Sequence, residues 1–126
     1  EGFTNAITIA GNIFTGAVSS SSSYGILDEG GTSHHIYDNT FNASFAYQFY
    51  GSGVLSLTID NNEMEGSTAA AIVLTDYAAI SGGHIGPSQS VSIHNNSFGP
   101  STSTNVFIAS VMGGKIANNM FGSTAA

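Results

Sequence analysis

A six-residue motif, Ile-x-x-Asn-x-(Phe/Met), occurs five times along this chain. Its copies begin at Ile9, Ile36, Ile59, Ile93 and Ile116. The motif Asn residues are separated by 27, 23, 34 and 23 residues, so a unit of about 23 residues repeats with occasional insertions. A period of this length is typical of a solenoid, in which each repeat stacks on the next and extends one continuous core.

Apolar and polar residues alternate ahead of the motifs, as in Ile7-Thr8-Ile9 and Val91-Ser92-Ile93. This period of two predicts a half-buried strand that leads into each motif. A second apolar segment follows in four of the units, at residues 24–27, 47–50, 71–74 and 106–109. Gly, Ser, Thr and Asn occupy every window long enough for a helix, which disfavours helices. The sequence therefore predicts an all-β chain with at least two strands in each unit.

The motif Asn is expected at a turn, because Asn tolerates left-handed backbone angles and hydrogen-bonds to nearby main chain. Stacked corners would align the Asn side chains, and each amide offers a donor and an acceptor to the coils on either side. The Phe or Met two residues later is expected to point into the core. The predicted structural ladder consists of Asn12, Asn39, Asn62, Asn96 and Asn119.

These repeats resemble the right-handed parallel β-helix of the pectate-lyase-like superfamily, which includes polysaccharide lyases, glycoside hydrolases, phage tailspikes and surface proteins. The resemblance spans nearly the whole chain and implies an all-β solenoid of about five coils. We expect a single domain over residues 1–126, with insertions at about 15–23, 75–90 and 99–105. Superfamily members normally cap both ends, whereas this chain opens on a coil and stops just after Phe121. We therefore expect a fragment of a longer solenoid, or a partner that covers the ends.

Charged residues make up only 7% of the chain, and eight carboxylates face one basic residue, Lys115, for a formal net charge of −7. So few cations cannot neutralise a row of phosphates, which disfavours nucleic acid and anionic membranes as partners. No apolar run approaches the roughly 20 residues of a membrane-spanning helix. The resemblance instead implies a polysaccharide or surface glycan as the partner, outside the cell or on a cell or virion surface.

Alignment of the motifs predicts which side chains face solvent on the strand before each Asn. One outward row contains Tyr37, Asp60 and His94 on successive coils roughly 4.8 Å apart, with His35 beside it. Tyr37 could stack on a sugar ring while Asp60 accepts hydrogen bonds from hydroxyl groups. We predict a glycan-binding strip at these four residues; an ordinary solvated surface is the alternative interpretation.

Asp28 and Asp76 each follow a second-strand segment and lie two units apart. In-register stacking would separate them by roughly twice 4.8 Å, near the ~6.5–9.5 Å between the carboxyl groups of inverting glycoside hydrolases. They are the candidate catalytic residues, and solubilising surface acids are the alternative interpretation. A lyase of the resembled type would imply an Arg or Lys base, and Lys115 is the one basic residue, so a hydrolase is favoured over a lyase.

His34 and His35 point to opposite faces of a strand, so they cannot share a metal ion. His34 falls in the inward row, where a hydrogen-bonded core histidine is expected. Calcium has candidate oxygen ligands in Asp60, Glu63 and Glu65, but the chain contains no recognised calcium loop. We therefore predict neither a metal ligand set nor a cofactor.

Three functions remain open at this point. The favoured one is a noncatalytic extracellular β-solenoid segment of a surface, adhesin or tailspike-like protein that contacts glycans or another chain. The second is a glycoside hydrolase or other polysaccharide-degrading enzyme. The third is a self-associating structural element, because open coil ends carry unpaired N–H and C=O groups that invite edge-to-edge stacking.

Overall fold

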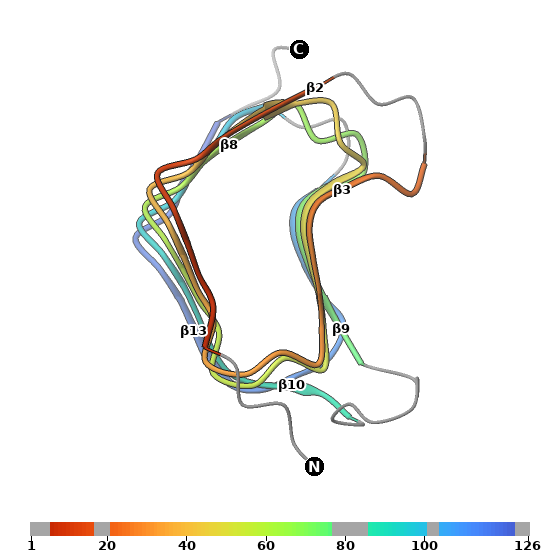
Figure 1. The fold of residues 1–126 in the computed structure, drawn as a ribbon, viewed down its shortest axis with the longest axis vertical. Helices are drawn as coiled ribbons and strands as arrows, with labels where there is room; N and C mark the ends of the chain where they lie inside the picture. The colour runs from red at the N-terminus through yellow and green to blue at the C-terminus, as the bar shows by residue number, and fades with distance from the viewer. Residues whose placement is uncertain (1–5, 17–20, 77–85, 101–103, 123–126) are drawn as a thin grey trace.

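The computed structural model describes residues 6–16, 21–76, 86–100 and 104–122. Fourteen strands in these residues form three parallel sheets. Each of the first four turns adds one strand to every sheet, and the last turn adds β13 and β14 to two of them. The result is a β-solenoid of about four turns, with the sheets as its three sides (Figure 1). The all-β parallel solenoid predicted from the repeat is therefore confirmed. No described residue belongs to a helix long and apolar enough to cross a membrane.

Each sheet is formed by equivalent segments of successive repeats. Sheet A holds the strands that lead into the motifs: β1 (Thr8–Ala10), β4 (His35–Tyr37), β7 (Thr58–Asp60), β10 (Ser88–His94) and β13 (Val111–Ala117). Sheet B holds the strands that follow the motif Asn: β2 (Ile13–Gly16), β5 (Thr40–Ala43), β8 (Glu63–Glu65), β11 (Ser97–Phe98) and β14 (Met120–Phe121). Sheet C holds the second apolar segments: β3 (Tyr24–Glu29), β6 (Tyr47–Ser52), β9 (Ala70–Thr75) and β12 (Thr104–Ile108).

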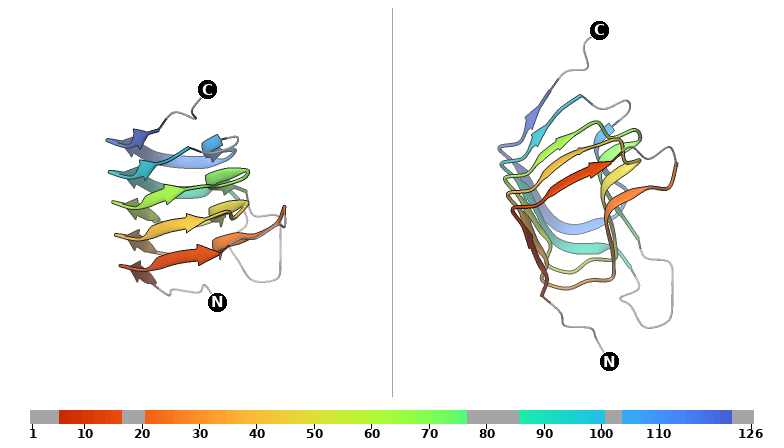
Figure 2. Two further views of the ribbon diagram at one scale, coloured as in Figure 1. Left: turned by 90° about the horizontal axis from the view of Figure 1, so that it is seen from above. Right: turned by 45° about the horizontal axis from the view of Figure 1, so that its top comes forward.

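The pairing register follows the motif in every coil of sheet A. Ile9 pairs with Ile36, Ile36 with Ile59, Ile59 with Ile93, and Ile93 with Ile116. The coils consequently stack in chain order, with the N-terminal and C-terminal coils at opposite ends (Figure 2). Equivalent residues of the repeat therefore lie above one another along a common axis.

The five motif Asn residues form a continuous hydrogen-bonded ladder. At each step the Nδ2 and the main-chain N–H of one Asn both donate to the Oδ1 of the Asn in the next coil, at 2.9–3.1 Å. The Nδ2 of Asn62 also donates to the carbonyls of Ile36 and Asp60. Because Asn39, Asn62 and Asn96 are buried, these bonds supply the partners that buried amides require.

The chain turns sharply between sheet A and sheet B, and in each coil this turn lies at the residue before the ladder Asn. The backbone angle φ is 66° at Gly11, 54° at Asp38, 53° at Asn61, 57° at Asn95 and 55° at Asn118. Gly, Asn and Asp tolerate this left-handed conformation better than other residues do. The left-handed turn expected at the motif Asn therefore lies one residue earlier, while the motif Asn bonds to the neighbouring coils.

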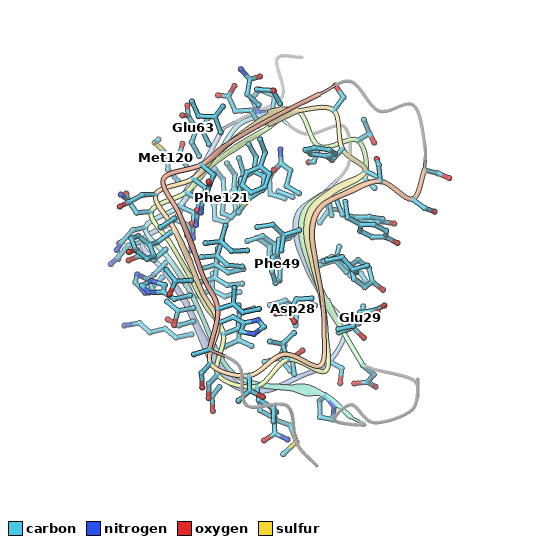
Figure 3. All side chains as sticks on the ribbon, viewed as in Figure 1. Asp28, Glu29, Phe49, Glu63, Met120 and Phe121 are labelled. Atoms are coloured by element: carbon cyan, nitrogen blue, oxygen red, sulfur yellow. The ribbon has the colours of Figure 1, made fainter. Side chains whose placement is uncertain are left out.

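Columns of like side chains fill the interior. The motif Phe and Met residues point inward as predicted, and Phe41, Met64 and Phe98 are at most 1% exposed. The rings of Phe14 and Phe41 stack with centroids 4.4 Å apart and planes within 3°. From the opposite side, sheet C contributes Phe49, which points into the same core (Figure 3).

Some of the described residues within the three predicted insertions belong to strands. β2 extends to Gly16, β10 begins at Ser88 and β12 begins at Thr104. One of these strand residues, Ser88, is buried, and its Oγ accepts a bond from the Val54 N–H at 3.1 Å. Residues 17–20, 77–85 and 101–103 of the predicted insertions lie outside the described residues.

Candidate functional site

The predicted glycan-binding strip lies on sheet A. The strand register places Tyr37 beside Asp60 and Asp60 beside His94, while His35 pairs with Thr58 in the neighbouring row. All four predicted residues are partly exposed. The structure thus brings them together on three successive coils of one surface.

The polar groups of this strip bond mainly to one another. His94 Nδ1 lies 3.0 Å from Asp60 Oδ1, an ion pair whenever the imidazole is protonated. Asn95 Nδ2 donates to the same oxygen at 3.1 Å, and one coil away Asn61 Nδ2 donates to Asp38 at 2.5 Å. These mutual bonds leave fewer free hydrogen-bonding groups for a ligand than the sequence suggested.

Tyr37 is also partly covered within the strip. Its ring lies against that of His35, with centroids 4.3 Å apart and an angle of 36° between the planes. His35 Nε2 is buried and has no hydrogen-bond partner among the described residues. A sugar stacking on Tyr37 would therefore have only the opposite ring face available.

Asp28 and His34, for which the sequence predicted separate roles, form one buried pair in the first turns of the solenoid. His34 Nδ1 lies 2.6 Å from Asp28 Oδ2, and the Gly31 N–H donates to Asp28 Oδ1 at 3.1 Å. Both side chains are about 90% buried, and Asp28 points into the interior (Figure 3). His34 is therefore confirmed as a hydrogen-bonded core histidine, and Asp28 has the structural role of holding it.

The register predicted for the Asp28 and Asp76 carboxylates is wrong. Asp28 pairs with Gly51, and Gly51 pairs with Leu74, so the residue two coils from Asp28 is Leu74 and not Asp76. Asp76 is exposed beyond the end of β9, whereas Asp28 is buried. The structure does not place these two acids in equivalent positions on one surface.

The three candidate calcium ligands are divided between two sides of the solenoid. Asp60 ends β7 in sheet A, whereas Glu63 and Glu65 lie in β8 of sheet B, beyond the corner at Asn62. Glu63 projects from the outer face of sheet B (Figure 3). Among the described residues, no group of three or more His, Cys, Asp or Glu side chains is placed to hold a metal ion.

A cluster of three tyrosines, which the sequence did not single out as a site, lies on the outer face of sheet C. Tyr24 and Tyr47 pair across β3 and β6, and their rings stack with centroids 5.5 Å apart. Tyr50 meets both rings edge-on, at 5.4 Å each. We call Tyr24, Tyr47 and Tyr50 the tyrosine platform.

Apolar and polar groups border the tyrosine platform. Leu27 pairs with Tyr50 and is exposed, and Phe107, which pairs with Val73 in the same row, is exposed two coils further on. Glu29 projects from the same outer face of sheet C (Figure 3). The face therefore combines exposed aromatic surface with hydrogen-bonding groups, as ligand sites generally do.

One sequence signal could have identified this platform. Tyr24 and Tyr47 begin equivalent apolar segments, and a tyrosine repeated at the start of two units suggests a stacked pair. Alternation does not extend to the third tyrosine, because Gln48 and Phe49 are both buried and Tyr50, three residues after Tyr47, lies on the same outer face. The repeated tyrosine at the start of these segments is therefore the one sequence signal for the stacked pair.

The fold defines the chain as a parallel β-solenoid built from short repeats. Comparison of the chain with protein-family models, with curated proteins and with solved structures gives no match.

Proposed function

We propose that this chain is a noncatalytic, extracellular segment of a right-handed, pectate-lyase-like β-solenoid that binds a polysaccharide on the outer face of sheet C. The tyrosine platform is the observation that supports this function. Its rings give a ligand a broad, rigid apolar surface, and each hydroxyl supplies a hydrogen-bonding group at the rim. The apolar C–H face of a sugar ring and its peripheral hydroxyls match such a surface.

The charge of the chain favours a neutral glycan. With a formal net charge of −7, the protein repels polyanions such as uronate polymers. An elongated polysaccharide lying parallel to the solenoid axis would pass from Tyr24 and Tyr47 toward Phe107. Residues on successive coils of the same sheet would then contact successive parts of the ligand.

Tyrosine fluorescence provides a direct test, because the chain contains no Trp. Titration with soluble neutral polysaccharides should change the emission of the wild-type chain. Tyr47→Ala should weaken binding about tenfold, since loss of one stacked ring costs on the order of 1.4 kcal/mol. Calorimetry on the same ligand gives the affinities independently of the fluorophore.

Tyr37→Ala is the matched control, because it removes a partly exposed tyrosine from sheet A. It should leave the affinity unchanged. If Tyr37→Ala and Asp60→Asn weaken binding while Tyr47→Ala does not, the predicted strip on sheet A is the site. If no neutral or acidic polysaccharide binds, glycan recognition by this segment is wrong. Release of reducing ends during incubation would instead identify a hydrolase.

A further inference from the structure

Three of the five tyrosines of the chain contact one another in the tyrosine platform. The ring centroids of Tyr24 and Tyr47 are 5.5 Å apart, and Tyr50 lies 5.4 Å from each. All three side chains are at least partly exposed, so an oxidant in solution can reach them. A one-electron oxidant converts a tyrosine phenol into a phenoxyl radical, with loss of one electron and one proton. The platform therefore holds oxidisable groups from two coils in contact with one another.

Tyr24 and Tyr47 have the geometry that favours a covalent bond between them. They pair directly across β3 and β6, and the angle between their ring planes is 18°. In-register side chains of parallel strands project in the same direction, so equivalent atoms of the two rings lie side by side. A phenoxyl radical carries much of its unpaired electron density on the carbons ortho to the oxygen. The reactive carbons of the two rings are therefore neighbours.

Tyr50 is oriented differently from this stacked pair. Its ring plane is at 74° to that of Tyr24 and at 70° to that of Tyr47. Its hydroxyl accepts a hydrogen bond from Thr75 Oγ1 at 3.3 Å, which ties the ring to the next coil in this orientation. A bond to either neighbour would require the Tyr50 ring to rotate away from Thr75. Coupling within the stacked pair is therefore favoured over coupling to Tyr50.

Few other side chains compete for a one-electron oxidant. The chain contains neither Cys nor Trp. Tyr37, on sheet A, lies against His35 and not against another tyrosine. Among the described residues, rings of two tyrosines meet only within the platform. Two phenoxyl radicals formed in this part of the chain are thus in contact only there.

From this geometry we propose that Tyr24 and Tyr47 are a site of oxidative modification, at which hydrogen peroxide and a haem peroxidase form a dityrosine bond. Each phenol gives up one electron and one proton, and the two radicals join through a new bond between their ortho carbons. The hydrogen atoms on these two carbons move to the oxygens and restore both hydroxyl groups. Peroxide accepts the two electrons and two protons and leaves as two molecules of water.

The dityrosine bond joins two coils that are otherwise held by hydrogen bonds and packing, since a chain without Cys forms no disulfide. Its two tyrosines are 23 residues apart in the sequence. A covalent loop of this length lowers the conformational entropy of the unfolded chain, as a disulfide does. The cross-linked chain should therefore melt about 10 °C higher than the unmodified chain.

Oxidation of the folded 126-residue chain with peroxide and a haem peroxidase tests this proposal. The expected product shows dityrosine fluorescence, migrates as a single chain under denaturing conditions and is lighter by two hydrogen atoms. Its yield per chain should not change on dilution, because the two rings are already in contact. Absence of dityrosine, or a yield that falls on dilution with a product of doubled mass, would overturn the proposal. Because no glycan is present, the outcome is independent of the function proposed for sheet C.

Mass spectrometry of proteolytic peptides locates the bond. The expected result is one cross-linked pair of peptides that contains Tyr24 and Tyr47. A bond from either residue to any other tyrosine would overturn this assignment. Peroxide without the peroxidase is the control for the oxidant, since it adds oxygen to exposed Met side chains and should form no dityrosine.

Tyr47→Phe and Tyr37→Phe form a matched pair, because each removes one hydroxyl group from a partly exposed tyrosine. Tyr47→Phe should lose the intramolecular dityrosine and the rise in melting temperature, since a phenyl ring forms no phenoxyl radical. Tyr37→Phe should keep both. Equal yields from the two variants would overturn the proposal, as would cross-linked wild-type chain that melts at an unchanged temperature.

Tyr24→Phe tests the other ring of the pair and should behave as Tyr47→Phe does. Circular dichroism before oxidation establishes that each variant retains its β-structure. Wild-type yield of dityrosine from a folded Tyr24→Phe variant would show that another pair of tyrosines couples, and would overturn the assignment.

Discussion

The residues at each corner show why this repeat needs Asn at one position and tolerates several residues at the position before it. Only a side chain with both a donor and an acceptor can receive two bonds from one coil and donate to another, as Asn62 does. The preceding position requires only a positive φ, which Gly11, Asp38 and Asn61 all adopt. Hydrogen bonding therefore requires Asn at the ladder position, whereas the position before it requires only a residue that tolerates a positive φ.

Replacement of a central ladder residue should be costly. Asn62→Ala removes the acceptor of the main-chain N–H of buried Asn39 and the amide that donates to the Ile36 and Asp60 carbonyls. Each unsatisfied buried group costs about 1–3 kcal/mol. We expect the free energy of unfolding, measured by urea denaturation, to fall by about 2–5 kcal/mol. Asn12→Ala, at the exposed end of the ladder, should cost less than about 1 kcal/mol. Equal losses would show that the ladder bonds contribute little.

Substitutions of the two candidate catalytic aspartates should differ in their effect on the stability of the protein, and neither should remove a catalytic activity. Asp28→Ala removes the carboxylate that contacts His34 Nδ1 and accepts from the Gly31 N–H, so we expect a loss of about 1–3 kcal/mol in unfolding free energy. Asp76→Ala changes an exposed side chain and should stay within about 0.5 kcal/mol of wild type. Thermal and urea denaturation of both variants measure the difference. A larger loss for Asp76→Ala would contradict the role assigned to Asp28.

At the scale of the strands, the repeated motif predicted the register of the strands that lie next to it. The constant spacing from Ile to Asn to Phe fixed the register of sheets A and B, and the structure has that register. The sheet B strands were not predicted as separate elements, because β11 and β14 have only two residues each. A segment this short shows no periodicity.

The register of sheet C could not be obtained in the same way. Tyr24 follows Asn12 by 12 residues, whereas Tyr47 follows Asn39 by only eight, so the first coil contains an insertion ahead of its third strand. Apolar character alone does not reveal such an offset. The apolar segments alone therefore do not fix the residue equivalent to Asp28, which two coils further on is Leu74 and not Asp76.

Core side chains lie close to Gly51 in sheet C. A Cβ at Gly51 would lie 2.8 Å from Leu74 Cδ2, 2.9 Å from Phe49 Cε1 and 3.2 Å from Val54 Cγ2. Gly51→Ala should therefore overpack the core and lower the unfolding free energy by about 1–3 kcal/mol. Glu29→Ala, at an exposed position of the same sheet, is the control and should change stability by less than about 0.5 kcal/mol. An unchanged melting temperature for Gly51→Ala would show that the neighbouring side chains can move aside.

At the scale of the whole molecule, each coil contacts only the coils next to it. The stability of such a solenoid is roughly a sum of coil and interface contributions. Coils with two neighbours gain two interfaces, whereas the coils at either end gain one. The completely buried side chains Phe41, Leu57, Ile59 and Ile93 all belong to coils with two described neighbours. Opening should therefore begin at the ends.

Hydrogen exchange should follow this gradient. We expect the slowest amide exchange in β4, β7 and β10 and the fastest in β1, β13 and β14, since strands with one neighbour open at lower free-energy cost. Mass spectrometry of peptides from each strand measures the rates. Uniform exchange along the 126-residue chain would contradict this gradient.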